Sequence, residues 1–147
     1  MSEKDYDNRM HSAEHILNSV MDKMFFCGRA FSTHIEKKKS KCDYRVRKMI
    51  TADEIREVER TVNEIIKLDV PVDTSFVTRA EAEARYFTGK LPADAGDNIR
   101  IVKIGNFDAC PCIGPHVRST GEIGRFYITT TDYNDNILRI RFKLEDN

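Results

Sequence analysis

The spacing of apolar residues predicts that the chain begins with an amphipathic helix. From about Glu3 to Met24, apolar side chains recur at steps of three and four residues, which is the spacing of one helix face. Cys27 and Gly28 follow, where we expect this helix to end. The apolar positions that define its face are Met10, Ala13, Leu17, Val20, Met21 and Met24.

Capping signals predict two further helices. Thr51 and Glu54 form a capping box, in which each side chain satisfies a free backbone N–H at a helix start. This helix should end near Asp69, just before Pro71. A second capping box starts a shorter helix: Thr78 pairs with Glu81, and Gly89 is expected to end the helix. The apolar stripe of the longer helix consists of Ile55, Val58, Val62 and Ile65.

Most of the remaining chain has the pattern of β-strands joined by turns. Ile137–Leu144 alternates Ile, Leu and Phe with Arg and Lys, and the preceding "DYNDN" turn predicts an antiparallel hairpin. Helices interrupt the strands without a regular βαβ order. We therefore expect one domain over residues 1–147, with an α+β fold and a mostly antiparallel sheet. The other predicted strands are Ala30–Glu36, Cys42–Ile50, Ile99–Ile104 and Phe126–Thr130.

The composition is that of a globular chain with no net charge. Of its 147 residues 40% are hydrophobic and 33% are charged, and 24 basic side chains balance 24 acidic ones. This balance argues against a protein that coats nucleic acid by charge alone. We see neither a signal peptide nor a membrane helix, which would need roughly 18 consecutive apolar residues. We therefore expect a cytoplasmic, reducing location, in which the four cysteines are thiols or metal ligands: Cys27, Cys42, Cys110 and Cys112.

Two histidines are spaced to share one face of the first helix. His11 and His15 are four residues apart, so their Cβ atoms should lie about 5–6 Å from each other. That spacing lets both imidazoles reach one metal ion. On its own the pattern is weak, because a pair of histidines on a helix is more often surface decoration.

A second pair with the same spacing strengthens the interpretation as a metal site. Cys112 and His116 lie in "CIGPH", where Gly114 and Pro115 can fold the backbone so that both side chains converge. Thiolate and imidazole are ligands that Zn²⁺ prefers. Such a site is structural when closed and catalytic when one position is left to water, and both remain open. Redox CxxC chemistry is excluded, since one residue separates Cys110 from Cys112; a nucleophilic cysteine remains an alternative.

The combined pattern resembles a known family. HxxxH on the first helix, followed roughly 100 residues later by CxxxH within "CIGPHVRSTGEIG", is similar to the editing domain shared by alanyl- and threonyl-tRNA synthetases and by freestanding AlaX-type proteins. The segment "EIREVERTVNEIIKLDVPV" resembles the second helix of the family, in which Glu59 and Asn63 match. "NIRIVKIG" resembles the strand before the cysteine loop, and "ILRIRFKL" resembles the closing strand.

The resemblance implies a trans-editing enzyme that hydrolyses the ester between a wrong amino acid and a tRNA, such as Ser-tRNA(Ala) or Ser-tRNA(Thr). It implies an antiparallel sheet wrapped around the long N-terminal helix. It also implies a zinc ion, with His11 and His15 in the catalytic roles, although some threonyl-type members work without metal. A chain of this length leaves no room for an aminoacylation domain. Cytoplasmic localisation and nucleotide (ATP) binding are further implications. The implied zinc ligands are His11, His15, Cys112 and His116.

Three departures from the family pattern bear on specificity more than on reaction type. The alanine-type loop reads CGGTH, whereas this chain has Ile113 and Pro115 at two of those positions, and its GPHV half is closer to the threonine-type loop. An acidic residue usually precedes the cysteine by two positions. Here Cys110 stands in its place, so either Cys110 is an additional ligand or Asp108 takes the acidic role. A glycine-rich stretch of alanine-type members is replaced by "STHIEKKKSK".

A basic segment between the first two predicted strands is a candidate tRNA contact. It should bind phosphates of the acceptor stem with a steep salt dependence, and a solvated loop is the alternative. Two other functions remain open for the chain: a non-catalytic, zinc-stabilised RNA-binding module, and a metal-dependent hydrolase of small esters or amides. The sequence predicts no membrane partner and leaves the oligomeric state open. The candidate tRNA-binding residues are Lys37, Lys38, Lys39 and Lys41.

Overall fold

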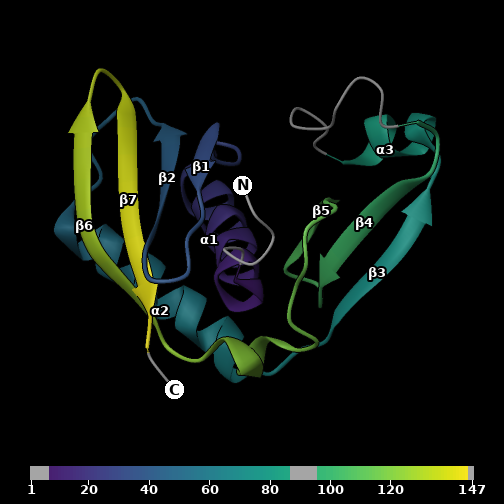
Figure 1. The fold of residues 1–147 in the computed structure, drawn as a ribbon. Coiled ribbons are helices and arrows are strands. Elements are labelled where there is room, and N and C mark those ends of the chain that lie inside the picture. Colours follow the sequence, from purple (N-terminus) through teal and green to yellow (C-terminus); the bar gives the residue numbers. More distant parts are fainter. Residues whose placement is uncertain (1–6, 87–95, 146–147) are drawn as a thin grey trace.

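Two antiparallel sheets lie on either side of the N-terminal helix α1 (Figure 1). The computed structural model describes residues 7–86 and 96–145. The four-stranded sheet has the order β1-β2-β7-β6, and the three-stranded sheet has the order β3-β4-β5. In chain order the elements are α1 (Asn8–Phe25), β1 (Ser32–His34), β2 (Ser40–Arg45), α2 (Ala52–Lys67), β3 (Val72–Val77), α3 (Arg79–Arg85), β4 (Ile99–Ile104), β5 (Asp108–Pro111), a 3₁₀ helix (Thr120–Ile123), β6 (Phe126–Asn134) and β7 (Ile137–Leu144).

Helix α1 is buried around its whole circumference between Met10 and Met21. The Asp7 side chain caps its start by accepting a hydrogen bond from the Met10 N–H (3.0 Å), and Phe26 ends it in a left-handed conformation (φ 55°). Its apolar stripe packs in the main core with α2 and the four-stranded sheet. Its polar side chains face the three-stranded sheet and the loop that follows it. Because buried polar groups need partners, this second side of the helix is where a site can form.

Helix α2 covers the open edge of the four-stranded sheet. Strand β6 is the edge strand. Asn63 accepts a hydrogen bond from the Phe126 N–H and donates one to the Phe126 carbonyl, both at 2.9 Å. Glu59 accepts a third from the Ile128 N–H at 2.7 Å. These side chains bind backbone groups that a further strand would otherwise pair, which protects an edge that could recruit other chains.

The three-stranded sheet belongs to a segment that leaves the rest of the fold and returns at one point. Pro71 and Ser119 form an isolated antiparallel bridge, and the Val72 N–H donates to the Arg118 carbonyl at 2.9 Å. We call residues 72–118 the insert and the other described residues the body. Within the insert, α3 covers one face of the sheet through a small apolar cluster of Ala82, Ile99 and Ile101.

The predicted fold class is confirmed: the described chain is α+β and both of its sheets are antiparallel. The Thr51–Glu54 capping box is present, and Thr78 accepts the predicted cap bond from the Glu81 N–H. The closing strand has the predicted bounds. Its hairpin turn uses Asp135 and Asn136, both with positive φ, which matches the right-handed twist of the paired strands.

Several predicted boundaries were wrong. The first helix begins at Asn8 rather than near Glu3, which itself lies outside the described residues. The strand predicted to reach Ile50 ends at Arg45, because the next N–H donates to a carbonyl in the β6–β7 turn. The strand predicted as Ala30–Glu36 is limited to Ser32–His34, and the strand beginning at Phe126 extends to Asn134. β3 and β5 were not predicted, and Gly89 lies outside the described residues.

Candidate metal centre

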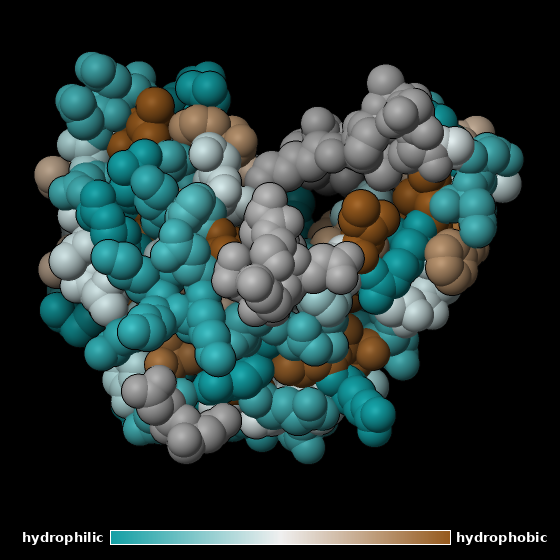
Figure 2. Space-filling view, in the orientation of Figure 1, coloured by the Kyte–Doolittle hydropathy of each residue, from teal (hydrophilic) through white to brown (hydrophobic). Residues whose placement is uncertain are grey.

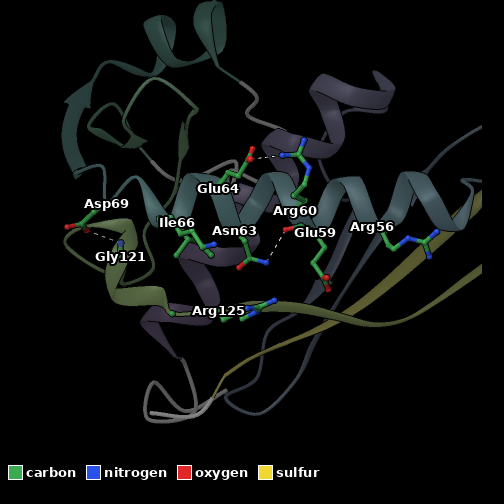
Figure 3. A pocket seen from close by; sticks show the side chains of 11 residues that line it. Arg56, Glu59, Arg60, Asn63, Glu64, Ile66, Asp69, Gly121 and Arg125 are labelled. Carbon is green, nitrogen blue, oxygen red and sulfur yellow. Dashed lines mark hydrogen bonds and ion pairs between the residues drawn. The ribbon is translucent and has the colours of Figure 1, made fainter.

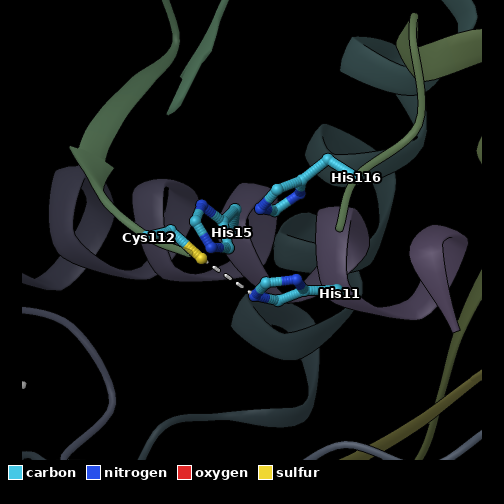
Figure 4. A group of neighbouring side chains, drawn as sticks. All are labelled: His11, His15, Cys112 and His116. Carbon is cyan, nitrogen blue, oxygen red and sulfur yellow. Dashed lines mark hydrogen bonds between the residues drawn. The ribbon is translucent and has the colours of Figure 1, made fainter. Parts of the chain in front are cut away.

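Three imidazole rings and one thiol converge between α1 and the loop that follows β5 (Figure 4). His11 and His15 lie one turn apart on α1, and each is only 4% exposed. The ring centroids are 4.8 Å apart for His11 and His15, 4.1 Å for His11 and His116, and 4.4 Å for His15 and His116. The Cys112 Sγ lies 3.3 Å from the His11 Nε2. The structure thus brings together all four residues that the two HxxxH-type spacings singled out.

Arg100 on β4 holds the loop that carries Cys112 and His116. Its Nη1 donates to the carbonyls of Cys112 (3.2 Å) and Gly114 (2.8 Å). The Cys112 N–H donates in turn to the Arg100 carbonyl at 3.1 Å. These bonds fold the "CIGPH" backbone back toward α1, so that the side chains of residues 112 and 116 both face the two α1 histidines.

The loop also fixes the protonation of His11. Its Nδ1 lies 2.9 Å from the Pro115 carbonyl oxygen. A carbonyl oxygen can only accept, so Nδ1 carries the hydrogen and donates it. The Nε2 of the same ring faces the Cys112 Sγ.

His116 is also held through its Nδ1, by a different partner. This atom lies 2.9 Å from the Ser12 hydroxyl, and that hydroxyl accepts a hydrogen bond from the Val117 N–H at 3.1 Å. The Nε2 of His116 is buried and has no hydrogen-bond partner among the described residues. A buried nitrogen without a partner is costly, and a metal ion is one group that would satisfy it.

His15 is supported by a carboxylate and a second thiol. Its Nδ1 lies 3.5 Å from an Asp108 oxygen and 3.3 Å from the Cys110 Sγ. Arg29 binds both Asp108 oxygens, at 2.6 and 3.2 Å. Although His15, Asp108 and Cys110 could themselves form a ligand group, Asp108 is engaged by Arg29. Its position is that of a carboxylate that orients a ligating histidine.

The electrostatics of the cluster favour a thiolate beside one charged and one neutral imidazole. Burial alone would raise the pKa of Cys112, but its interactions with the three surrounding histidines outweigh burial and lower that pKa to about 3. Burial and the neighbouring histidines lower the pKa of His116 to about 4. Burial also acts to lower the pKa of His15, yet its bonds to Asp108 and Cys110 raise it well above the usual value. Burial raises the pKa of Asp108, and the bonds to His15 and Arg29 outweigh this and lower it.

The donor set fits a borderline-soft metal ion. The four ligand atoms lie within 4.8 Å of one another. Ligands bound at about 2.0–2.3 Å in a tetrahedron are roughly 3.5 Å apart, so a small contraction of the cluster would complete the site. The group could therefore hold a metal ion.

The segment that carries Cys112 and His116 matches a described family. Residues 99–141 match the threonyl and alanyl tRNA synthetase second additional domain. This segment of the chain belongs to that family. The matched segment runs from β4 through the cysteine loop into β7. His11 and His15 lie outside it and join the cluster through the packing of α1.

Several alanine–tRNA ligases are similar to this chain. The chain is 34% identical over 145 residues to the ligase of Methanopyrus kandleri, covering 91% of this chain and 15% of that protein. It is 34% identical over 123 residues to the ligase of Fervidobacterium nodosum, covering 83% of this chain and 14% of that protein. The chain thus spans about a seventh of the length of these relatives. The family supports a tRNA-related editing role, whereas ATP binding has no support in these matches.

Sequence reasoning missed the residues that support the cluster. Ser12, Arg29 and Arg100 each contact a cluster member or its loop, and no spacing pattern marks them in the sequence. Asp108 had a signal, because an acidic residue near the cysteine is usual in the family. Both Cys110 and Asp108 lie beside His15, and the role of each at the cluster stays a prediction.

The predicted tRNA-binding lysines belong to the body, and none of them is a member of the cluster. Lys37, Lys38 and Lys39 are exposed in the β1–β2 connection, and Lys41 lies on β2. Their contact with tRNA stays a prediction. The face in Figure 2 is mainly hydrophilic, with apolar side chains in small separate patches. No helix among residues 7–86 and 96–145 is long and apolar enough to cross a membrane.

A groove of about 710 Å³ along α2 shares no lining residue with the cluster (Figure 3). Its polar side chains are already engaged in holding the fold. Asn63 and Glu59 bind β6, and Asp69 accepts a hydrogen bond from the Gly121 N–H at 2.9 Å. We therefore assign this groove no role in the chemistry.

Proposed function

We propose that this protein hydrolyses the ester bond of mischarged aminoacyl-tRNA, acting in trans at the cluster of His11, His15, Cys112 and His116. The observation that carries the proposal is the convergence of three imidazoles and one thiolate in a chain with a segment of the synthetase second additional domain family. Ser-tRNA(Ala) and Ser-tRNA(Thr) are the proposed substrates.

We further propose zinc as the ion, with the same four residues as ligands. The supporting features are the soft donor set, the partnerless Nε2 of His116 and the depressed pKa of Cys112. When bound, a zinc ion would supply a Lewis acid, and it would lower the pKa of a water to about 7 if one of the four residues left its position to that water.

The protein's own contribution is to hold three imidazole rings in fixed orientations. Pro115 holds His11, Ser12 holds His116, and Asp108 holds His15, in each case through Nδ1. The side chains therefore need no reorganisation when substrate arrives, which is how preorganised groups lower a barrier. Arg29 keeps Asp108 ionised in its buried position.

Deacylation needs one proton transfer, and the cluster contains groups suited to each end of it. The water oxygen bonds to the ester carbonyl carbon, the bond to the ribose oxygen breaks, and one proton passes from the water to that oxygen. In a metal-free form of the protein, His11 is proposed to accept this proton and His15, with its raised pKa, to donate one to the ribose oxygen. When an ion is bound, both rings are ligands and neither transfers a proton.

The experiment is a deacylation assay with Ser-tRNA(Ala), Ser-tRNA(Thr) and Gly-tRNA(Ala), with correctly charged Ala-tRNA(Ala) as the control substrate. We expect release of free amino acid from at least one mischarged tRNA and little release from the control. Binding of tRNA without turnover would instead support the non-catalytic RNA-binding module.

Metal dependence is tested by chelation and by Cys112→Ala. Each should reduce the deacylation rate by at least about 100-fold, because removing a ligand that also fixes its neighbours disables the site. Cys27→Ala is the matched control, since Cys27 lies at the end of α1 and contacts no cluster member in the described bonds. Full activity after both treatments would exclude a role for the ion.

A further inference from the structure

One row of residues crosses the sheet of the insert from the cluster to its outer strand. The Cys112 N–H bond to the Arg100 carbonyl continues the β4–β5 ladder by one residue, and Arg100 is the register partner of Phe76 on β3. Residues directly opposite one another in antiparallel strands project to the same face. Phe76, Arg100 and Cys112 therefore share one face, and neighbouring strands about 4.8 Å apart put Phe76 about 10 Å from Cys112.

Phe76 is exposed on that face although the other face is covered. Its relative exposure is 60%. The next residue, Val77, points the opposite way and packs with Ile99 and Ile101 beneath α3. Phe76 packs into neither apolar cluster of the described residues. A single exposed apolar residue is common and carries little weight alone. The position of Phe76, in the same row as Cys112, is the informative observation.

Arg100 lies between the two and adds a positive charge. Its guanidinium is held beside the loop by the carbonyls of Cys112 and Gly114. A ligand that extends from the cluster toward Phe76 therefore passes over a fixed cation. These groups match the parts of an aminoacyl nucleotide in order. The cluster would face the ester, the Arg100 cation the phosphodiester-linked ribose, and the flat apolar ring of Phe76 the base.

We propose that Phe76 is the stacking platform for the terminal nucleobase of the tRNA whose aminoacyl ester lies at the cluster. This inference rests on the proposed function and names a subsite for its substrate. The ester joins the amino acid to the terminal ribose, so a carbonyl held at the cluster leaves the ribose and base to extend over the adjoining surface. The Phe76 ring on β3 lies within reach of this base. Stacking of a base on an aromatic ring needs no hydrogen-bond partners on the protein.

The experiment measures binding and turnover separately. The binding probe is a tRNA acceptor-stem minihelix that carries serine through a non-hydrolysable 3′-amide, prepared with its terminal adenine and with an abasic terminal ribose. Phe76→Ala should raise the Kd of the intact probe about tenfold, and Phe76→Tyr should restore it. The wild type should bind the abasic probe about tenfold more weakly than the intact probe. On the abasic probe, Phe76→Ala should have the same Kd as the wild type. Phe26→Ala is the matched control, since Phe26 is 88% exposed at the far end of α1.

Two results would overturn the platform. One is an unchanged Kd for Phe76→Ala on the intact probe. The other is an equal loss on intact and abasic probes, which would mean that Phe76 contacts the amino acid or the backbone instead of the base. Hydrolysis of mischarged tRNA by the wild type is scored independently. Adenine-dependent binding through Phe76 without hydrolysis would refute the catalytic proposal and leave the platform standing.

Discussion

Pro115 contributes to the cluster through its carbonyl oxygen, which accepts the hydrogen of the His11 Nδ1. Any residue at this position has that carbonyl. Ile113, the other departure from the alanine-type loop, has a side chain that is 85% exposed. The two departures from the alanine-type loop therefore leave the four cluster side chains in place. They alter the surface around the cluster, where an amino-acid side chain of the substrate would be distinguished.

The raised pKa of His15 predicts proton release when a metal binds. His15 is protonated at neutral pH, whereas Cys112, with a pKa of about 3, and His116, with a pKa of about 4, are not. An ion must displace the proton on His15, so metal affinity should rise with pH up to the pKa of this histidine. We expect close to one proton released per zinc at pH 7, measured by calorimetry in buffers of different ionisation enthalpy. Equal heats in all buffers would contradict the assignment.

At the scale of elements, α2 acts on β6 as a neighbouring strand would. Three hydrogen bonds from Asn63 and Glu59 satisfy backbone groups at the start of the edge strand. The family pattern in this helix is therefore explained by architecture and not by chemistry. It also explains why β6 can end its sheet without a partner.

Removing the Asn63 side chain should destabilise the fold while leaving the cluster unchanged. Asn63→Ala leaves a partly buried N–H and carbonyl of Phe126 without partners, at a cost of about 2–3 kcal/mol in the free energy of unfolding. The measurement is equilibrium urea unfolding, with Arg56→Ala on the exposed side of α2 as the control. Identical unfolding midpoints for Asn63→Ala and the control would refute this role.

The sequence predicted the elements whose own residues specify them, and missed those specified by neighbours. The α2 cap and the β7 alternation are local signals. β3 is exposed at most of its positions and β5 is four residues long, so both exist mainly because β4 pairs with them. The same division holds at the cluster, where spacing identified the histidines and cysteine. Arg29 and Arg100 act only through contacts that the fold creates.

At the scale of the molecule, the cluster joins the insert to the body. His11 and His15 come from the body, whereas Cys112 and His116 come from the insert. Away from the cluster, the two parts are connected where the chain passes twice, at Pro71 and Ser119, and where Ser19 and Lys23 of α1 donate hydrogen bonds to the Phe107 carbonyl. An ion bound by all four residues would fix the position of the insert against α1.

The basic β1–β2 connection gives a prediction about the whole substrate. Reversing Lys37, Lys38 and Lys39 to Glu should weaken tRNA binding and flatten its dependence on salt, because fewer counterions are released from phosphates. The measurement is the Kd for tRNA between about 50 and 200 mM salt. Lys38→Glu and Lys67→Glu are compared as matched single variants, the first in the basic connection and the second on α2. An unchanged salt slope in the triple variant would remove this segment from the tRNA-binding surface.

The chain enters and leaves the insert side by side, at Pro71 and Ser119, and this arrangement has an evolutionary consequence. Because the insert begins and ends at adjacent points, its outer portion can lengthen, shorten or be exchanged without rerouting the rest of the chain. A lineage could in this way revise the exposed surface of β3 while retaining two loop side chains and the helix they meet. The outer surface of the insert and the cluster would then diverge at different rates.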